Sequence, residues 1–198
     1  MKSVNIASNE VSQGSWKPSP KTKVILILLY IITWIIFVGL SIEAGGFITN
    51  AVFVLVKPDA VPYLWQQVDL RDLLQYGHGF FFTLVTIIGI VTVLKAILFY
   101  LIISILHNKK IKIEQPFTNI AQRFILRIAS LSLLIGLFSI IGAKGAAWLN
   151  AQGVKLPDLE SLHLSGADVW IFMSIALFVV AYIFKKGIEL QTEQDLTV

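Results

Sequence analysis

Four long apolar stretches constrain the fold of this chain more than any other feature of its sequence. They cover residues 24–42, 79–106, 124–143 and 168–184. The first would form a helix of about 28 Å, which nearly matches the ~30 Å hydrocarbon core of a bilayer. Only 14% of the residues are charged, whereas a soluble domain carries about a quarter. The sequence therefore predicts an all-α polytopic membrane protein with a four-helix transmembrane bundle over residues 24–186.

Polar segments flank the predicted bundle on both sides. Residues 1–23 contain Ser, Asn and Pro without an apolar period, so we expect a disordered arm. Residues 187–198 form a short tail whose charged residues are all acidic. Gly187 permits a break in the last helix, and the apolar residues that follow are spaced as in an extended segment. The tail is therefore predicted to be extended and to lie outside the membrane.

The distribution of Lys and Arg predicts how the helices are oriented. Eleven of these residues lie on the side that carries both termini, and four lie in the loops of the other side. Because cytoplasmic loops carry the excess of positive charge, the arm and the acidic tail are both predicted to be cytoplasmic. The same clustering beside apolar stretches accounts for the net charge of +4, so we expect no direct binding of nucleic acid.

Lys95 and Glu43 are the candidate intramembrane charges. A charge at the bilayer centre costs about 2.5–3.5 kcal/mol on insertion scales, so such residues often serve a function. Lys95 lies close to the midplane if Leu106 marks the cytoplasmic edge of the second helix. If that helix instead extends into the cytoplasm, Lys95 lies only a few residues inside the membrane. Its ammonium then snorkels to the headgroups or hydrogen-bonds a neighbouring helix. Glu43 pairs with Lys95 only if the second helix lies high in the membrane.

The third predicted helix carries two further patterns. Arg123 and Arg127 are four residues apart and share one face at its cytoplasmic end. They are candidates for contact with anionic lipid or a phosphate, or they are ordinary positive-inside anchors. Small residues also recur every three or four positions, which predicts the close approach of another helix rather than a ligand groove. These small residues are Ser132, Gly136, Ser139 and Ala143.

Motifs for catalysis, cofactors and metal ions are lacking from the sequence. The chain has no cysteine, which excludes disulfides, thiolate metal sites and a Cys nucleophile. His78, His107 and His163 are far apart and show no metal-binding spacing. No Walker A loop, GxGxxG or nucleophile elbow occurs. We therefore expect no metal site and no bound cofactor, and we do not expect an enzyme.

The acidic tail is the candidate docking element for a protein partner. Its negative charge is not attracted to an anionic inner leaflet, so it is not a lipid-binding device. Short segments that mix acidic and apolar residues can become ordered on a folded partner. The alternative is that the tail folds back beneath the bundle. The candidate docking residues are Glu189, Leu190, Asp195, Leu196, Thr197 and Val198.

Two segments carry a family resemblance: "KAILFYLIISILHNKKIKIEQPFTNIAQR" and "FKKGIELQTEQDLTV". The first leads from apolar residues through a basic loop into Pro116, Phe117 and Thr118, and the second contains Gly, Glu-Leu and then Asp-Leu-Thr-Val. Both resemble signature segments of the domain-of-unknown-function 2975 (DUF2975) family, which are bacterial membrane proteins with four predicted spans. The resemblance covers about residues 20–198 and is most specific in the tail.

The resemblance implies a multi-pass protein of the bacterial inner (cytoplasmic) membrane. The family has no assigned activity, but its members are often encoded beside a small helix-turn-helix regulator, which implies a cytosolic partner of that kind. Similar sequences in the family also tend to carry a lysine at the position of Lys95. This points to a structural or a functional reason for the residue without choosing between them.

Three functions are compatible with these features, and membrane lipid surrounds the protein in each of them. The leading hypothesis is a non-enzymatic membrane protein that senses the state of the envelope or tethers a cytosolic regulator, with the tail and the basic 107–123 loop as its docking face. The second is a small oligomeric transporter or ion-coupled carrier that uses Lys95, with the small-residue stripe as the interface between copies. The third is an accessory subunit of a membrane complex.

Overall fold

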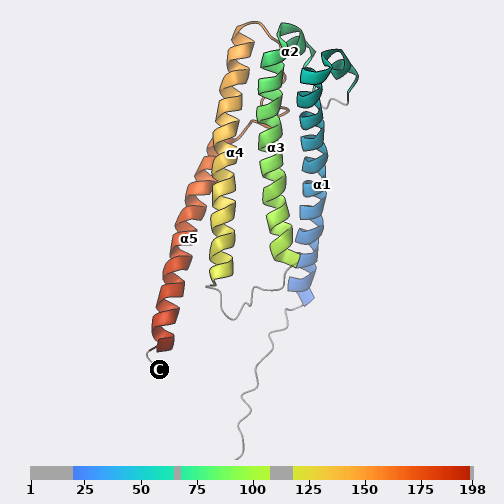
Figure 1. Ribbon diagram of the computed structural model, residues 1–198. Helices are drawn as coiled ribbons and strands as arrows, with labels where there is room; N and C mark the ends of the chain where they lie inside the picture. Colours follow the sequence, from blue (N-terminus) through green and yellow to red (C-terminus); the bar gives the residue numbers. More distant parts are fainter. Residues whose placement is uncertain (1–19, 65–67, 108–117, 197–198) are drawn as a thin grey trace, which may run out of the picture.

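The computed structural model describes residues 20–64, 68–107 and 118–196, and this part of the chain is helical and contains no strand. Four long helices stand side by side (Figure 1). The elements are α1 Pro20–Val56, η1 Pro58–Tyr63, α2 Arg71–Tyr76, α3 His78–His107, α4 Asn119–Ala151 and α5 Ala167–Leu196. The four long helices are each long and apolar enough to cross a membrane, which confirms the predicted all-α fold with four helices of membrane-spanning type.

The first helix is much longer than predicted. α1 has 37 residues, which corresponds to about 55 Å. Its predicted end at residue 42 was wrong, because the apolar sequence resumes after Glu43 and two glycines and continues the helix. α1 ends at Val56 because the residue before a proline is disfavoured in helical conformation. Accordingly, Lys57 precedes Pro58 with φ −150° and ψ 76°.

Other helix bounds agree with the predictions or extend them. α3 matches the predicted 79–106 stretch to within one residue at each end. α4 begins after Thr118, whose side-chain oxygen accepts a hydrogen bond from the Ala121 N–H at 3.2 Å and caps the helix. It continues past the predicted residue 143, through small and apolar residues. α1 begins inside the predicted arm, and the rest of that arm, residues 1–19, lies outside the described residues.

The extended tail that the sequence predicted is instead helical. α5 passes through Gly187 without a break and continues to Leu196. A glycine lowers helix stability by about 1 kcal/mol, but extending an existing helix requires no new nucleus. Side-chain contacts support the extension, because Lys186 Nζ donates to Glu189 Oε2 at 2.7 Å and the Thr192 hydroxyl donates to the backbone at 2.9 Å. Residues 197–198 lie outside the described residues.

The four long helices form an open row rather than a closed bundle (Figure 1). The extensive pairings are α1 with α3, α3 with α4 and α4 with α5, so that α1 and α5 occupy opposite edges. Neighbouring helices are antiparallel. We call the end at which α1 begins and α5 ends the basic end, because it carries Lys21, Lys23, Lys185 and Lys186. The opposite end, with η1 and α2, is the loop end.

α1 packs on α3 along a seam with the period of a coiled coil. Ring contacts set the register: Tyr30 stacks on His107, with 6.3 Å between ring centroids, and Phe37 meets Tyr100. The residues of α1 on this face recur at alternating intervals of three and four, the spacing that favours left-handed supercoiling. They are Tyr30, Thr33, Phe37, Leu40, Ala44, Phe47, Ala51 and Val54. The two helices therefore pair along most of their length.

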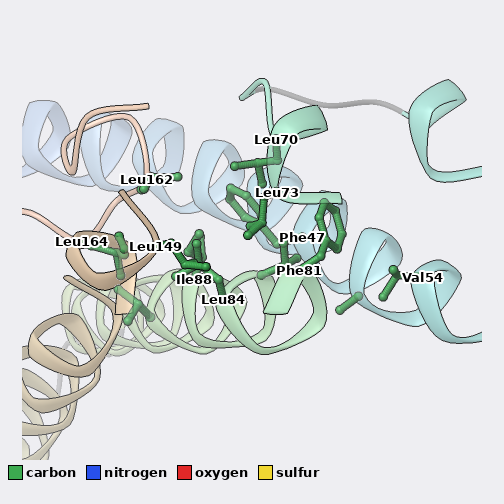
Figure 2. Packing of buried hydrophobic residues seen from close by; sticks show 14 of the residues in the cluster. Phe47, Val54, Leu70, Leu73, Phe81, Leu84, Ile88, Leu149, Leu162 and Leu164 are labelled. Carbon is green, nitrogen blue, oxygen red and sulfur yellow. The ribbon is translucent and has the colours of Figure 1, made fainter. Parts of the chain in front are cut away.

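The apolar core lies towards the loop end of the molecule. Figure 2 shows Phe47 of α1, Leu73 of α2 and Phe81 of α3 packed together, with Leu162 and Leu164 reaching the same cluster. Residues 24–29 of α1, near the basic end, are all exposed. Because six consecutive helical residues cover the whole circumference, this part of α1 is exposed on every side among the described residues.

The chain turns back along the bundle after α4. We call residues 152–166 the connecting segment. It leaves α4 at the loop end, yet α5 starts beside Gly136, because a Cβ there would lie 3.2 Å from the Ala167 carbonyl oxygen. Gly136 is fifteen residues before the end of α4, about 22 Å along its axis. The connecting segment therefore descends by that distance, and α5 begins within the bundle rather than at its end.

Two leucines hold the connecting segment against the helices. Leu162 and Leu164 are 0% and 1% exposed. Gly142 of α4 makes room for the second of them, because a Cβ on Gly142 would lie 2.7 and 2.9 Å from the two terminal carbons of Leu164. Between these leucines lies His163, whose ring meets Phe47 of α1 edge-on, with 6.3 Å between ring centroids.

Candidate functional site

Lys95 of α3 is anchored to the connecting segment. Its Nζ donates a hydrogen bond to the backbone carbonyl of His163 at 2.9 Å and lies 5.8 Å from the centre of the Trp170 ring of α5. The ammonium thus reaches a neighbouring element of the protein and does not extend along α3 to the basic end. Non-helical backbone at membrane depth needs such partners, because lipid offers none to a free carbonyl.

Glu43 of α1 approaches the same residue from another side. Its Oε2 lies 3.1 Å from His163 Nε2, and the two side chains are 23% and 28% exposed. Within the part of the chain that the structure describes, this oxygen has no hydrogen bond of good geometry. The contact with His163 is therefore mainly electrostatic, and Glu43 also attracts Lys95 through space. We call Glu43, Lys95 and His163 the charge cluster.

The helix register places both charged residues at one depth. Glu43 is thirteen residues beyond Tyr30 in α1, and Lys95 is twelve residues before His107 in α3. Because Tyr30 and His107 are in contact, both charges lie about 18–20 Å from that contact along the helices. The sequence left open whether the two could meet. The structure brings them together, with His163 between them.

The cluster reduces the cost of placing charge within the helices. An isolated lysine at the centre of a membrane helix costs about 2.5–3.5 kcal/mol on insertion scales. Here the carboxylate of Glu43 attracts the positive charge of Lys95, and the Lys95 ammonium donates a hydrogen bond to the backbone carbonyl of His163. Removing one partner of such a pair destabilises the fold, because the other charge is then buried without a partner. The cluster therefore links α1, α3 and the connecting segment, and the contacts of each member depend on the presence of the other two.

His163 has a backbone conformation that usually belongs to glycine. Its φ is 56°, in the left-handed region, which costs a side-chain-bearing residue about 1 kcal/mol or more. It ends a turn in which the His163 N–H donates to the Glu160 carbonyl and the Leu164 N–H to the Leu159 carbonyl, both at 2.9 Å. This is the hydrogen-bond pattern of a Schellman cap, where glycine is the common choice. His163 therefore occupies this position at some conformational cost.

The turn before His163 is fixed by its own side chains. The Ser161 hydroxyl donates to Asp158 Oδ1 at 2.6 Å, and the Ser161 N–H donates to the other carboxylate oxygen at 3.4 Å. The hydroxyl contact is the main cause that lowers the pKa of the Asp158 carboxyl below its usual value. Asp158 therefore stays ionised throughout the neutral range, and its hydrogen bonds are lost only as the pH falls through that lowered value.

His163 is the residue that sequence reasoning missed. The three histidines were treated together as scattered loop residues, and His78 and His107 do lie apart, at the two ends of α3. The available signal was the Leu162-His163-Leu164 triplet, whose alternation is typical of a segment with one buried face. That signal indicates burial of the leucines. It does not identify Glu43 or Lys95 as neighbours of the histidine between them.

The remaining candidates of the third predicted helix separate into two groups. Arg123 and Arg127 are exposed near the basic end of α4, a position open to both lipid contact and simple anchoring. The small residues pack on α5, as predicted, because a Cβ on Gly136 would lie only 2.6 Å from Ile171 Cγ1. Ser132 and Ser139 are fully buried. Ala143 is only half-buried, and the buried small residue on that turn is Gly142.

The candidate docking residues belong to the last turns of α5. Glu189 is bound to Lys186, and Leu190 is 61% exposed. Asp195 and Leu196 end the helix, while Thr197 and Val198 lie outside the described residues. Across residues 20–64, 68–107 and 118–196, no group of three or more Asp, Glu or His side chains is arranged to hold a metal ion.

Comparison with models of protein families, with curated proteins and with solved structures finds no match to this chain. The site is therefore interpreted from its own geometry.

Proposed function

We propose that this protein is a non-enzymatic sensor in the bacterial inner membrane, which tethers a cytosolic helix-turn-helix regulator. One observation carries the proposal: α5 is a single helix of 30 residues that joins the charge cluster to the basic end. It starts four residues after His163 and ends in the acidic turns beyond Lys186. A rigid helix can transmit a displacement at one end to the other, if it has two alternative positions.

The surface of α5 beyond Lys186 supports a docking role. Leu190 is 61% exposed, and Glu189 and Glu193 flank it on neighbouring positions. A helix that presents an apolar residue among acidic ones is suited to a groove with a basic rim. A regulator that binds DNA through basic surface offers such a rim. The expectation of this kind of partner comes from the family resemblance of the tail.

A pull-down with point variants tests the docking surface. We expect the chain tagged on its N-terminal arm to retain a small DNA-binding protein from cells of its own species, and Leu190→Arg to reduce retention at least tenfold. Thr192→Arg is the matched control, because it lies about 200° around the same helix. Equal retention by the Leu190→Arg and unaltered chains would refute docking at this surface, and so would retention of no DNA-binding protein.

The proposal also requires the basic end to face the cytoplasm. Because the chain has no cysteine, single cysteines introduced at Asp72 and at Gln194 report on the two ends without background. We expect a membrane-impermeant maleimide to label Asp72→Cys, at an exposed position of α2, in right-side-out vesicles and to label Gln194→Cys only after the vesicles are opened. The reverse pattern would invert the topology and exclude a cytosolic partner at the tail.

A second candidate function is an oligomeric ion-coupled carrier. The observation that favours it is the charge cluster itself, since ionisable residues and non-helical backbone within a membrane domain recur along transport pathways. In liposomes that contain the purified protein, we expect such a carrier to show ion flux that Lys95→Met abolishes. Flux that is unaffected by Lys95→Met would remove the support that the cluster gives to this function.

A further inference from the structure

We infer that the charge cluster is a proton-operated latch: the charged imidazole of His163 holds the connecting segment close to Glu43 of α1, and loss of its proton loosens this contact and lets the segment and the start of α5 shift about the buried Leu162 and Leu164. This inference rests on the proposed sensor function and names the signal, which is the proton concentration at the loop end. Three independent features of the structure support it.

The first feature is the chemistry of the contact. Imidazole is the side chain whose usual pKa lies between pH 5 and 8. His163 Nε2 lies 3.1 Å from a Glu43 oxygen that is buried and has no well-directed hydrogen bond among the described residues. An imidazolium is attracted to this carboxylate as an ion, whereas a neutral imidazole offers at most a poorly aligned hydrogen bond. The contact is therefore strong at low pH and weak at high pH.

The second feature is the set of charges around His163. Glu43 on α1 faces its ring, and Lys95 on α3 binds its carbonyl. The buried residues of α4 are all uncharged. On the segment itself and on α5, the nearest acidic side chains are those of Glu160 and Asp168, and both are exposed. His163 thus has one charged partner for its ring, the Glu43 carboxylate. Protonation of the ring adds a second positive charge beside this carboxylate, which otherwise faces only that of Lys95.

Asp158, the other acidic residue in the turn before His163, does not respond over the same range. Its pKa is lowered, chiefly by the hydrogen bond from Ser161, so its carboxyl stays ionised at neutral pH. The turn that it stabilises therefore keeps its charge and its shape in the neutral range. His78 and His107 carry the same side chain as His163, so the variants below decide which histidine a structural change comes from.

The third feature is the short chain that joins His163 to α5. Only three residues separate His163 from Ala167, where α5 begins. A displacement of His163 is therefore carried directly to the start of that helix. The buried residues of α5 are small, Ser174 and Ala181, and the hydroxyls of Ser132, Ser139 and Ser174 are buried without a hydrogen bond in the described structure.

The test measures the distance between the connecting segment and α1 at different pH. Ser165→Cys and Thr49→Cys, both at exposed positions, carry spin labels in the full chain reconstituted in lipid nanodiscs. We expect one narrow distance distribution at pH 5.5 and a growing second population up to pH 8. A single proton changes the ratio of the two populations at most tenfold per pH unit.

Three variants make the test specific. His163→Gln should remove the pH dependence, and Glu43→Gln should reduce it, because the imidazolium loses its partner. His78→Gln is the matched control, since His78 is exposed near the loop end and should leave the response unchanged. A distribution that does not vary with pH would overturn the latch. So would a response steeper than tenfold per unit, or one that survives in His163→Gln.

The latch and the tether can fail separately. The distances are measured without a partner, so a pH response combined with no retained regulator supports the latch and removes the proposed tether. If the regulator is retained but the distances do not vary with pH, the tether is supported, the latch is removed and the proton is not the signal.

Discussion

Replacing Lys95 with methionine is expected to lower the free energy of unfolding by about 2–4 kcal/mol. The substitution keeps the length and apolar character of the side chain, so the loss is electrostatic. The carbonyl of His163 loses its hydrogen bond, and the Glu43 carboxylate keeps its charge without the ammonium that opposes it. Equilibrium unfolding in mixed detergent micelles measures the change.

A double variant shows whether the two charges act as a pair. Lys95→Met combined with Glu43→Gln should cost less than the two single substitutions together, with a coupling energy of about 0.5–3 kcal/mol. Lys144→Met is the matched control on α4, because Lys144 is exposed, and it should change stability by less than about 0.5 kcal/mol. Strict additivity of the two cluster substitutions would contradict the pairing.

Replacing Gly136 with alanine is expected to destabilise the protein by about 1–3 kcal/mol. The new Cβ would lie 2.6 Å from Ile171 Cγ1 and 3.2 Å from two backbone atoms of α5. The side chain of Ile171 can rotate, but the backbone atoms cannot move unless the two helices separate. The same unfolding measurement detects the loss.

Gly145, nine residues further along α4, provides the comparison. A Cβ at this position meets nothing within 4 Å, so Gly145→Ala should raise helix stability by about 0.5–1 kcal/mol. The two substitutions are chemically identical and lie in one helix. Effects of the same sign would mean that the close approach of α4 and α5 contributes nothing to stability.

Much of the fold could be predicted from the sequence because it depends on local composition. Apolar stretches long enough to cross a bilayer identify four helices wherever they occur in a chain. The spacing of small residues predicted that a helix would pack closely on α4, since spacing on one helix determines which residues share a face. Predictions of where helices end were less accurate. The first stretch was predicted to end at residue 42 and the last helix to break at Gly187, but α1 and α5 pass through both sites.

The charge cluster could be predicted only in part. Lys95 and Glu43 stand out because charges are rare in apolar stretches, yet their depth depends on the register between two helices. That register is set by contacts such as Tyr30 with His107, which no single helix reveals. His163 lies in a loop by sequence and within the bundle by structure. Its position follows from the burial of Leu162 and Leu164. Leu164 is buried beside Gly142 of α4, so its place depends on a contact between two segments that the loop sequence alone does not show.

The open row of helices also decides how mutations combine. Each inner helix packs extensively on two neighbours and each edge helix on one, so a change in α1 reaches α5 through three successive helix interfaces and is attenuated at each. The connecting segment provides a shorter route, because His163 touches α1 directly and is joined to α5 through the backbone. Substitutions at the two edges should therefore behave as independent unless they alter residues 152–166. The connecting segment is thus the part of the chain where a single substitution can affect both edge helices at once.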